Sequence, residues 1–239
     1  LWGRTDERIT LFKSIGALDS ERLLVLGPKL DPANAHSAEP ALIINRDGRI
    51  TNALEIPAAF QMNDGYDSHS PLSTTSITHM NSEARLGLCG YGVANGRGFS
   101  GEPLPSHDFG FMATFSIDSG WNWLWIEGSN SISTCTHDPF GDVLLATGFA
   151  EHPTTGTQET TLVEVAGEND AELITITIDG MASSGRDIHL RNDGSLLIVG
   201  SAWSPDESWS SSSPLIIELD ENRDLVNTTL LDVQGRATI

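Results

Sequence analysis

The sequence repeats one glycine-terminated phrase four times, and this repetition restricts the possible folds more than any other feature. The copies end at Gly27, Gly90, Gly148 and Gly200, and they align without gaps when counted back from these glycines. Each copy places two short apolar runs around a polar turn: SIGALDSERLLVLG, SITHMNSEARLGLCG, CTHDPFGDVLLATG and DIHLRNDGSLLIVG. Apolar runs on both sides of such a turn are typical of a β-hairpin. The repeat therefore predicts four equivalent hairpins.

A second pair of apolar runs follows each phrase, so that every unit contains four predicted strands. Apolar residues do not recur at the spacing of a helix over any useful length. These pairs are ALIINRDGRITNALEI, FMATFSIDSGWNWLWIEG, TLVEVAGENDAELITITI and PLIIELDENRDLVNTTLL. Repeated four-stranded antiparallel units predict an all-β fold, a β-propeller whose blades bury their faces against one another. A β-sandwich is the alternative, but it does not require the same phrase four times.

We predict one β-propeller domain over residues 1–239, with repeats at approximately 14–75, 76–130, 131–184 and 185–234. Residues 235–239 resemble the start of a further first strand. The chain therefore contains four complete repeats and the beginning of a fifth. Two arrangements fit this pattern: a small ring closed by its terminal strands, or a piece of a larger propeller.

Three stretches carry a resemblance to a known class of repeat. Residues 143–148 and 193–200 match the end of an I-A-V-D-x-x-G-N-x-Y-V-T-G pattern, and SGWNWLW at 119–125 resembles the D-G-x-x-x-W part that follows it. The phrases look like the SBBP-type β-propeller repeats of prokaryotic secreted and cell-surface proteins. This resemblance implies a propeller fold and an extracellular or cell-surface location, often without an assigned activity. The chain departs from the pattern by placing histidine where the family has a small residue.

The charge balance excludes several classes of partner. With 33 acidic and 13 basic residues the formal net charge is −20, which repels nucleic acid and anionic membranes. No apolar run is long enough to span a bilayer, so we expect no membrane insertion. An acidic surface suits salty surroundings, although it is also found in ordinary acidic proteins. The chain begins at Leu1 without methionine, which fits a removed leader, a longer parent chain or a larger assembly.

Three histidines occupy one position of the repeat. Gly16, His79, His137 and His189 are equivalent when the phrases are aligned on their final glycines. The first strand of each blade lines the central channel of a propeller, so three imidazoles there could hold one zinc, iron or copper ion. Such a metal could activate bound water. The alternative is a structural histidine that was copied by duplication and packs between blades.

The two cysteines and two tryptophans are further candidate site residues. Cys89 and Cys135 fall in adjacent repeats at positions of similar height, so either an inter-blade disulfide or two buried thiols fits the sequence. Trp203 and Trp209 lie in the serine-rich stretch SAWSPDESWSSSS and could present flat faces to a sugar or an aromatic partner. Folding of these two rings over the edge of the blade is the alternative.

No catalytic signature accompanies these residues. The chain contains no phosphate-binding glycine loop, no G-x-S-x-G motif and no H-E-x-x-H or C-x-x-C motif. We therefore predict a non-catalytic extracytoplasmic propeller that acts as a recognition or scaffold module for a protein or carbohydrate ligand. The alternative function is a metalloprotein with His79, His137 and His189 on the axis, performing hydrolytic or oxidative chemistry.

Overall fold

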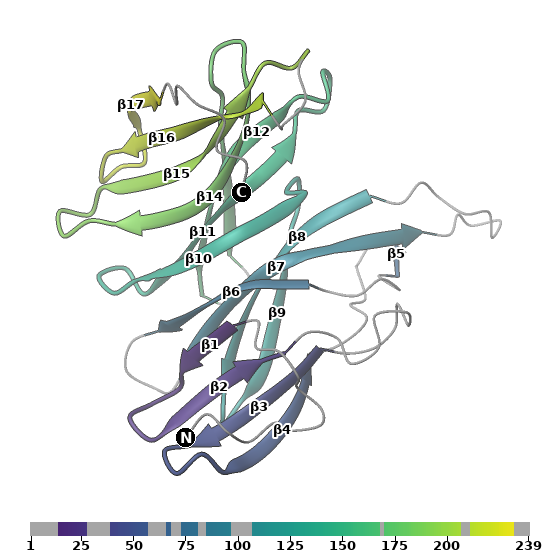
Figure 1. The fold of residues 1–239 in the computed structure, drawn as a ribbon, viewed down its shortest axis with the longest axis vertical. Helices are drawn as coiled ribbons and strands as arrows, with labels where there is room; N and C mark the ends of the chain where they lie inside the picture. The colour runs from purple at the N-terminus through teal and green to yellow at the C-terminus, as the bar shows by residue number, and fades with distance from the viewer. Residues whose placement is uncertain are drawn as a thin grey trace.

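The computed structural model describes residues 14–27, 39–56, 66–67, 73–80, 85–96, 107–167, 170–206 and 211–231. These residues form four antiparallel sheets, here called blades 1 to 4, and contain no α-helix. Figure 1 shows the blades following one another along the long axis of the molecule, from blade 1 at the bottom to blade 4 at the top. The predicted all-β fold of propeller blades is confirmed.

Each blade is a meander in which consecutive strands pair. Blade 1 comprises β1 (Ser14–Ala17), β2 (Arg22–Leu26), β3 (Glu39–Asn45) and β4 (Ile50–Ile56). Blade 2 comprises β6 (Ser73–Met80), β7 (Arg85–Gly96), β8 (His107–Ser116) and β9 (Gly120–Ile126), and the short β5 (Tyr66–Asp67) pairs with the end of β7.

Blades 3 and 4 follow the same plan. Blade 3 comprises β10 (Ser131–Asp138), β11 (Val143–Glu151), β12 (Gln158–Ala166) and β13 (Ala171–Ile176). Blade 4 comprises β14 (Ala182–Leu190), β15 (Leu196–Trp203), β16 (Ser213–Leu219) and β17 (Leu225–Leu230). The second and fourth blades begin at Ser73 and Ala182, slightly before the predicted repeat starts, and residues 235–239 lie outside the described residues.

The repeated glycine has a structural cause. In blade 3 the extra residue Ser133 makes a β-bulge in β10, and a Cβ on Gly148 would overlap the carbonyl oxygen of Ser131. Only glycine permits this approach of two backbones. The same overlap would occur in the neighbouring blades, between Gly90 and the Ser73 carbonyl and between Gly200 and the Ser184 carbonyl.

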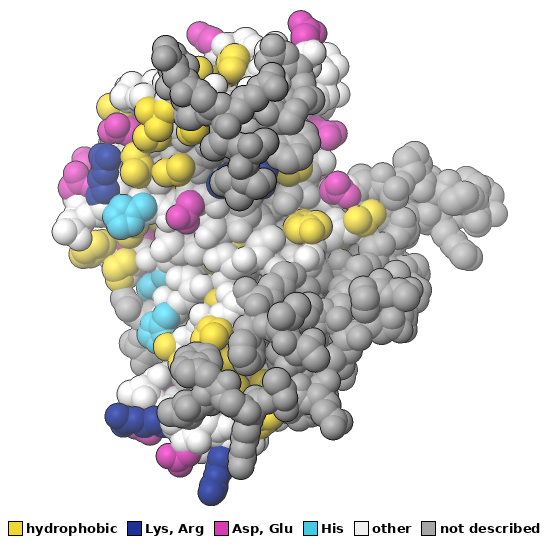
Figure 2. Space-filling model, viewed as in Figure 1, with side chains coloured by type: hydrophobic (Ala, Val, Ile, Leu, Met, Phe, Trp, Pro, Cys, Tyr) yellow, Lys and Arg dark blue, Asp and Glu magenta, His cyan; other side chains and the backbone are white. Residues whose placement is uncertain are grey.

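The hydrophobic core is divided among the interfaces between successive blades. One cluster joins blades 1 and 2 through leucines such as Leu24 and Leu86, a second joins blades 2 and 3, and a third joins blades 3 and 4. Among the described residues, no core cluster joins blade 1 to blade 4. Blade 4 carries exposed hydrophobic side chains on β15 and β17: Val199, Leu225, Val226 and Leu230. Figure 2 shows hydrophobic side chains on the part of the surface where blade 4 lies, at the upper left.

The two ends of the blades differ. Among the described turns, those that join the first to the second strand, or the third to the fourth, are short and lie at one end, on the left in Figure 1, as the β10–β11 and β14–β15 turns do. The opposite end, here called the connection end, carries the described β11–β12 loop and the described β9–β10 and β13–β14 connections between blades. Within the described part of the chain, no helix has the length and apolarity needed to cross a membrane.

Candidate functional site

A pocket of about 550 Å³ lies at the connection end, between blades 3 and 4. Residues from both blades line it, so it exists only because the two sheets pack side by side. The lining comprises Phe149, Thr155, Gly156, Thr157 and Gln158 from blade 3, and Ala182, Arg186, Trp203 and Pro205 from blade 4. The volume lies within the usual range for small-ligand sites.

Trp203 is held in the wall of this pocket by the strand that carries it. It is the last residue of β15, it is half-buried, and it pairs with Ala182 of β14. The indole therefore offers a fixed aromatic surface whose position is set by backbone pairing. Trp209, the other predicted ligand-binding tryptophan, lies outside the described residues.

Arg186 enters the pocket because of a bulge. The register of β14 against β15 shifts between Gly185 and Asp187, so that Arg186 is the unpaired extra residue of the strand. A bulge turns a side chain away from the direction that strict alternation would give it. Arg186, which is exposed, thereby lines the same pocket as Trp203.

The opposite wall is a loop that hydrogen-bonds to itself. His152 Nδ1 accepts hydrogen bonds from the backbone N–H groups of Thr154 and Thr155, both at 3.3 Å. The His152 carbonyl accepts from Gly156 N at 2.8 Å, and His152 N donates to the Thr157 carbonyl at 2.8 Å. These bonds order the β11–β12 loop without any ligand.

Sequence reasoning identified Trp203 but missed its neighbours in the pocket. Phe149 and Gln158 belong to paired strands of blade 3, and they meet Arg186 and Trp203 only where blade 3 packs on blade 4. One signal was available for Arg186. It is one of only 13 basic residues in the chain, and it lies immediately before the fourth phrase.

The structure does not bring the three repeated histidines together. His137 is buried, whereas His79 and His189 are exposed on other blades. Among the described residues, no group of three His, Cys, Asp or Glu side chains is arranged to hold a metal ion. On the face shown in Figure 2, histidine side chains lie at separate places.

The separation of the histidines follows from the length of the first turn in each blade. His137 pairs with Leu144, which faces blade 2, and His79 pairs with Leu86, which faces blade 1. His189 pairs instead with Leu197. The residues on either side of it, Leu196 and Ile198, point toward blade 3, so Leu197 and His189 lie on the opposite face of blade 4.

Four residues separate the paired strands in blades 2 and 3, but five do so in blade 4. A shift of one residue turns a side chain to the other face of its sheet. His189 therefore points away from blade 3, whereas His137 and His79 each point toward the preceding blade. The three imidazoles therefore belong to different blade faces.

His137 has a local partner that accounts for its position. Its Nε2 atom lies 2.9 Å from Oδ1 of Asp142 in the turn that follows β10. The imidazole is only 4% exposed, while the carboxylate is 66% exposed. Asp142 has a φ of 51°, a left-handed conformation that is uncommon for a residue other than glycine. The contact thus links the first strand of blade 3 to its own turn.

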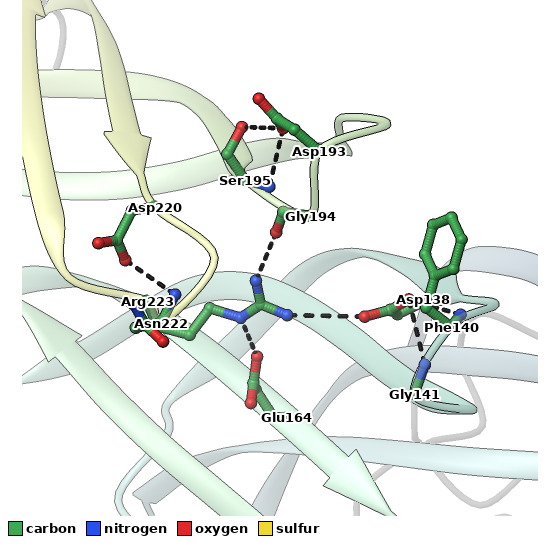
Figure 3. A network of polar contacts seen from close by, with 10 residues as sticks. All are labelled: Asp138, Phe140, Gly141, Glu164, Asp193, Gly194, Ser195, Asp220, Asn222 and Arg223. Carbon is green, nitrogen blue, oxygen red and sulfur yellow. Dashed lines mark hydrogen bonds and ion pairs between the residues drawn. The ribbon is translucent and has the colours of Figure 1, made fainter.

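The turns of blades 3 and 4 are joined by Arg223, shown in Figure 3. This residue lies between β16 and β17, and its guanidinium donates to Glu164 of β12 and, at 2.8 Å, to the carbonyl oxygen of Gly194. A third contact, of 3.7 Å, reaches Oδ2 of Asp138 in blade 3. The arginine side chain is 14% exposed, so these interactions are largely shielded from water. These contacts hold blades 3 and 4 together at the end opposite the pocket.

The cysteines lie on facing strands of two blades. Cys89 in β7 and Cys135 in β10 are buried free thiols in the cluster between blades 2 and 3. The two thiols are close enough to hydrogen-bond, and the neighbouring Cys89 together with burial raises the pKa of the Cys135 thiol well above its usual value. The structure brings the two predicted cysteines together as neighbouring buried thiols, and the disulfide between them stays a prediction.

No family model matches the sequence, and no curated protein matches it. Solved structures with similar folds include a member of the DUF4221 family from Bacteroides vulgatus, at 12% identity, covering 95% of this chain and 69% of that one with a TM-score of 0.45. A mannose phosphorylase from Leishmania mexicana shows 10% identity, with 93% and 67% coverage and a TM-score of 0.44.

A β-fructofuranosidase from Bombyx mori shows 10% identity and a TM-score of 0.45, over 92% of this chain and 49% of that one. Similarity at this level carries no information about activity, and the SBBP-type resemblance stays a prediction. The chain is an all-β protein built from four antiparallel propeller-type blades.

Proposed function

We propose that this protein is a non-catalytic recognition module that works outside the cytoplasm and binds a carbohydrate in the pocket of Trp203 and Arg186. The observation that carries the proposal is the pocket itself, which combines an aromatic surface, a guanidinium and the amide of Gln158 between two blades. Binding sites are typically apolar clefts with a few fixed polar groups.

The chemistry of the lining favours a sugar that bears a carboxylate, such as a uronic acid. The indole of Trp203 offers a flat apolar face for the C–H groups of a sugar ring. Arg186 offers the donors of a guanidinium, which match a carboxylate in a two-point hydrogen bond. Gln158 adds a donor and an acceptor for sugar hydroxyl groups.

The proposed location rests on the sequence. An acidic surface of net charge −20 suits a salty exterior medium, and the phrases resemble repeats of secreted and cell-surface proteins. A rigid β scaffold with its connecting loops at one end is a common design for recognition. No observation among the described residues favours the metal-dependent alternative.

The test is a binding titration with a galacturonate trisaccharide and its neutral galactose counterpart. We expect the wild-type chain to bind the uronate form, with a change in tryptophan fluorescence and a measurable heat. Trp203→Ala should weaken binding at least about tenfold, because the aromatic anchor of a site usually contributes more than 1 kcal/mol. Arg186→Gln should remove the preference for the uronate over the neutral sugar.

Two matched variants control for general effects. Phe140 is an aromatic residue that is 78% exposed at the opposite end, and Arg46 is an arginine that is 77% exposed. Phe140→Ala and Arg46→Gln should leave the affinity unchanged. The proposal fails if neither sugar binds, or if Trp203→Ala binds the uronate as tightly as the wild type. Uronate binding that is unchanged in Trp203→Ala but lost in Arg186→Gln would show that the site recognises only the carboxylate, and this result also overturns the proposed stacking of a sugar on Trp203.

A further inference from the structure

The only two cysteines of the chain meet across one interface between blades. Cys89 has no exposed surface and Cys135 is 6% exposed, and both belong to the cluster between blades 2 and 3. Their thiols are within hydrogen-bonding reach of each other although they lie on different sheets.

Hydrogen bonds hold the strands that carry the two cysteines in place. Thr75, the bulge residue of β6, donates through Oγ1 to the carbonyl oxygen of Ile132 in β10 at 2.8 Å. The same Oγ1 lies 3.7 Å from Sγ of Cys89. Thr134 of β10 donates back to the hydroxyl of Ser76 at 3.2 Å. The cysteine pair therefore lies beside strands that are hydrogen-bonded to each other across the interface, and a disulfide forms only between cysteines that are held close together.

We propose that Cys89 and Cys135 form a disulfide that joins blades 2 and 3 when the chain folds in an oxidising medium. The thiolate of one cysteine attacks a disulfide oxidant such as oxidised glutathione and releases one glutathione thiol. The second cysteine then displaces the other glutathione from this mixed disulfide. The pair loses two protons and two electrons, and the oxidant is reduced to two thiols.

The environment of the pair determines when this exchange takes place. A thiol with a raised pKa is mostly protonated at neutral pH, and a protonated thiol is a poor nucleophile. Burial also keeps an oxidant away from Cys89 in the folded state. Both effects place the reaction in the folding chain, before blades 2 and 3 close, and both protect the product from later reduction.

The experiment compares the full chain refolded with oxidised and reduced glutathione against the chain refolded with a strong reductant. After oxidative refolding we expect an intact mass lower by two hydrogen atoms, no titratable thiol in denaturant, and a linked Cys89–Cys135 peptide. The unfolding midpoint should lie roughly 6 to 15 °C above that of the reduced protein, because the bond closes a long loop of the unfolded chain.

Serine variants provide the controls. Cys89→Ser and Cys135→Ser should each unfold at the same temperature in both buffers, close to the midpoint of the reduced wild type. If these variants do not fold, the mass and thiol count of the wild type still decide the question. Two free thiols per chain after oxidative refolding to the native circular dichroism spectrum overturn the proposal, as does a bond that joins two chains. This result is independent of sugar binding.

Discussion

At the residue scale, the last position of the repeated phrase shows how a close backbone contact can require glycine at one position. Gly148 lies opposite the bulge of β10, and its missing side chain leaves room for the carbonyl oxygen of Ser131. Gly90 and Gly200 meet the same restriction in blades 2 and 4. A glycine repeated for this reason indicates the fold and carries no chemistry of its own.

Gly148→Ala should therefore lower the free energy of unfolding by about 2 to 4 kcal/mol, because the added methyl group overlaps backbone atoms that cannot rotate away. Urea denaturation followed by circular dichroism measures the change. Gly141→Ala is the control. Its Cβ would lie 3.1 Å from Cγ2 of Val143 in an exposed turn, and we expect a change within about 0.5 kcal/mol. Equal effects of the two substitutions would contradict this explanation of the repeat.

Asp193 in the β14–β15 turn gives a prediction about pH. Its Oδ1 atom accepts from the hydroxyl and the backbone N–H of Ser195, at 2.6 and 3.0 Å, and these bonds lower the pKa of Asp193. A carboxylate with a depressed pKa stabilises the fold above its ordinary pKa and loses this contribution as the pH falls through the depressed value. Ser195→Ala should raise the pKa of Asp193 toward its ordinary value. Carboxyl-carbon NMR titration measures it, and an unchanged value would count against the hydrogen bonds.

At the scale of the elements, blades 3 and 4 are held together at both ends. Near the pocket, the backbone N–H and the hydroxyl of buried Thr160 both donate to the hydroxyl of Ser183 across the interface at 3.0 Å. At the opposite end, Arg223 bridges to Glu164 and Asp138 (Figure 3). Between these polar contacts lies the apolar cluster of the two sheets. This combination fixes the relative position of the blades that form the pocket.

Arg223→Ala should destabilise the protein by about 1 to 3 kcal/mol, because it leaves two shielded carboxylates without their cation. The backbone of Arg223 has a φ of 69°, and alanine keeps this strain, so the comparison isolates the side chain. Arg46 pairs with Glu21 on the exposed surface at 3.4 Å, and Arg46→Ala should cost at most about 0.5 kcal/mol. Thermal unfolding of both variants measures the two losses of stability. Equal losses would contradict the conclusion that the contacts of Arg223 are shielded from water.

At the scale of the whole molecule, much of the architecture could be predicted from the sequence, because a repeat depends on local pairing. The phrase length, the polar turns and the repeated glycine all belong to a single hairpin, and all four predicted hairpins are found within separate sheets. The all-β blades were predictable for that reason.

The candidate site was less predictable, because it depends on contacts between blades. A gapless alignment conceals the longer first turn of blade 4, and that single residue turns His189 to the opposite face from the one that His137 occupies. The pocket partners of Trp203 come from the loop of one blade and the bulge of another. Pocket residues that come from two blades are brought together by packing, so no single segment of the sequence identifies them.

The central claim is that each glycine-terminated phrase forms the first hairpin of its own sheet, and that the sheets stack side by side. Long-range backbone NOEs in a deuterated sample test this claim most directly. The account predicts contacts between Leu144 and His137, between Leu144 and Val165, and between Ile198 and Ile188. Backbone pairing between β11 and β15, which would place two phrases in one sheet as in a β-sandwich, would contradict it.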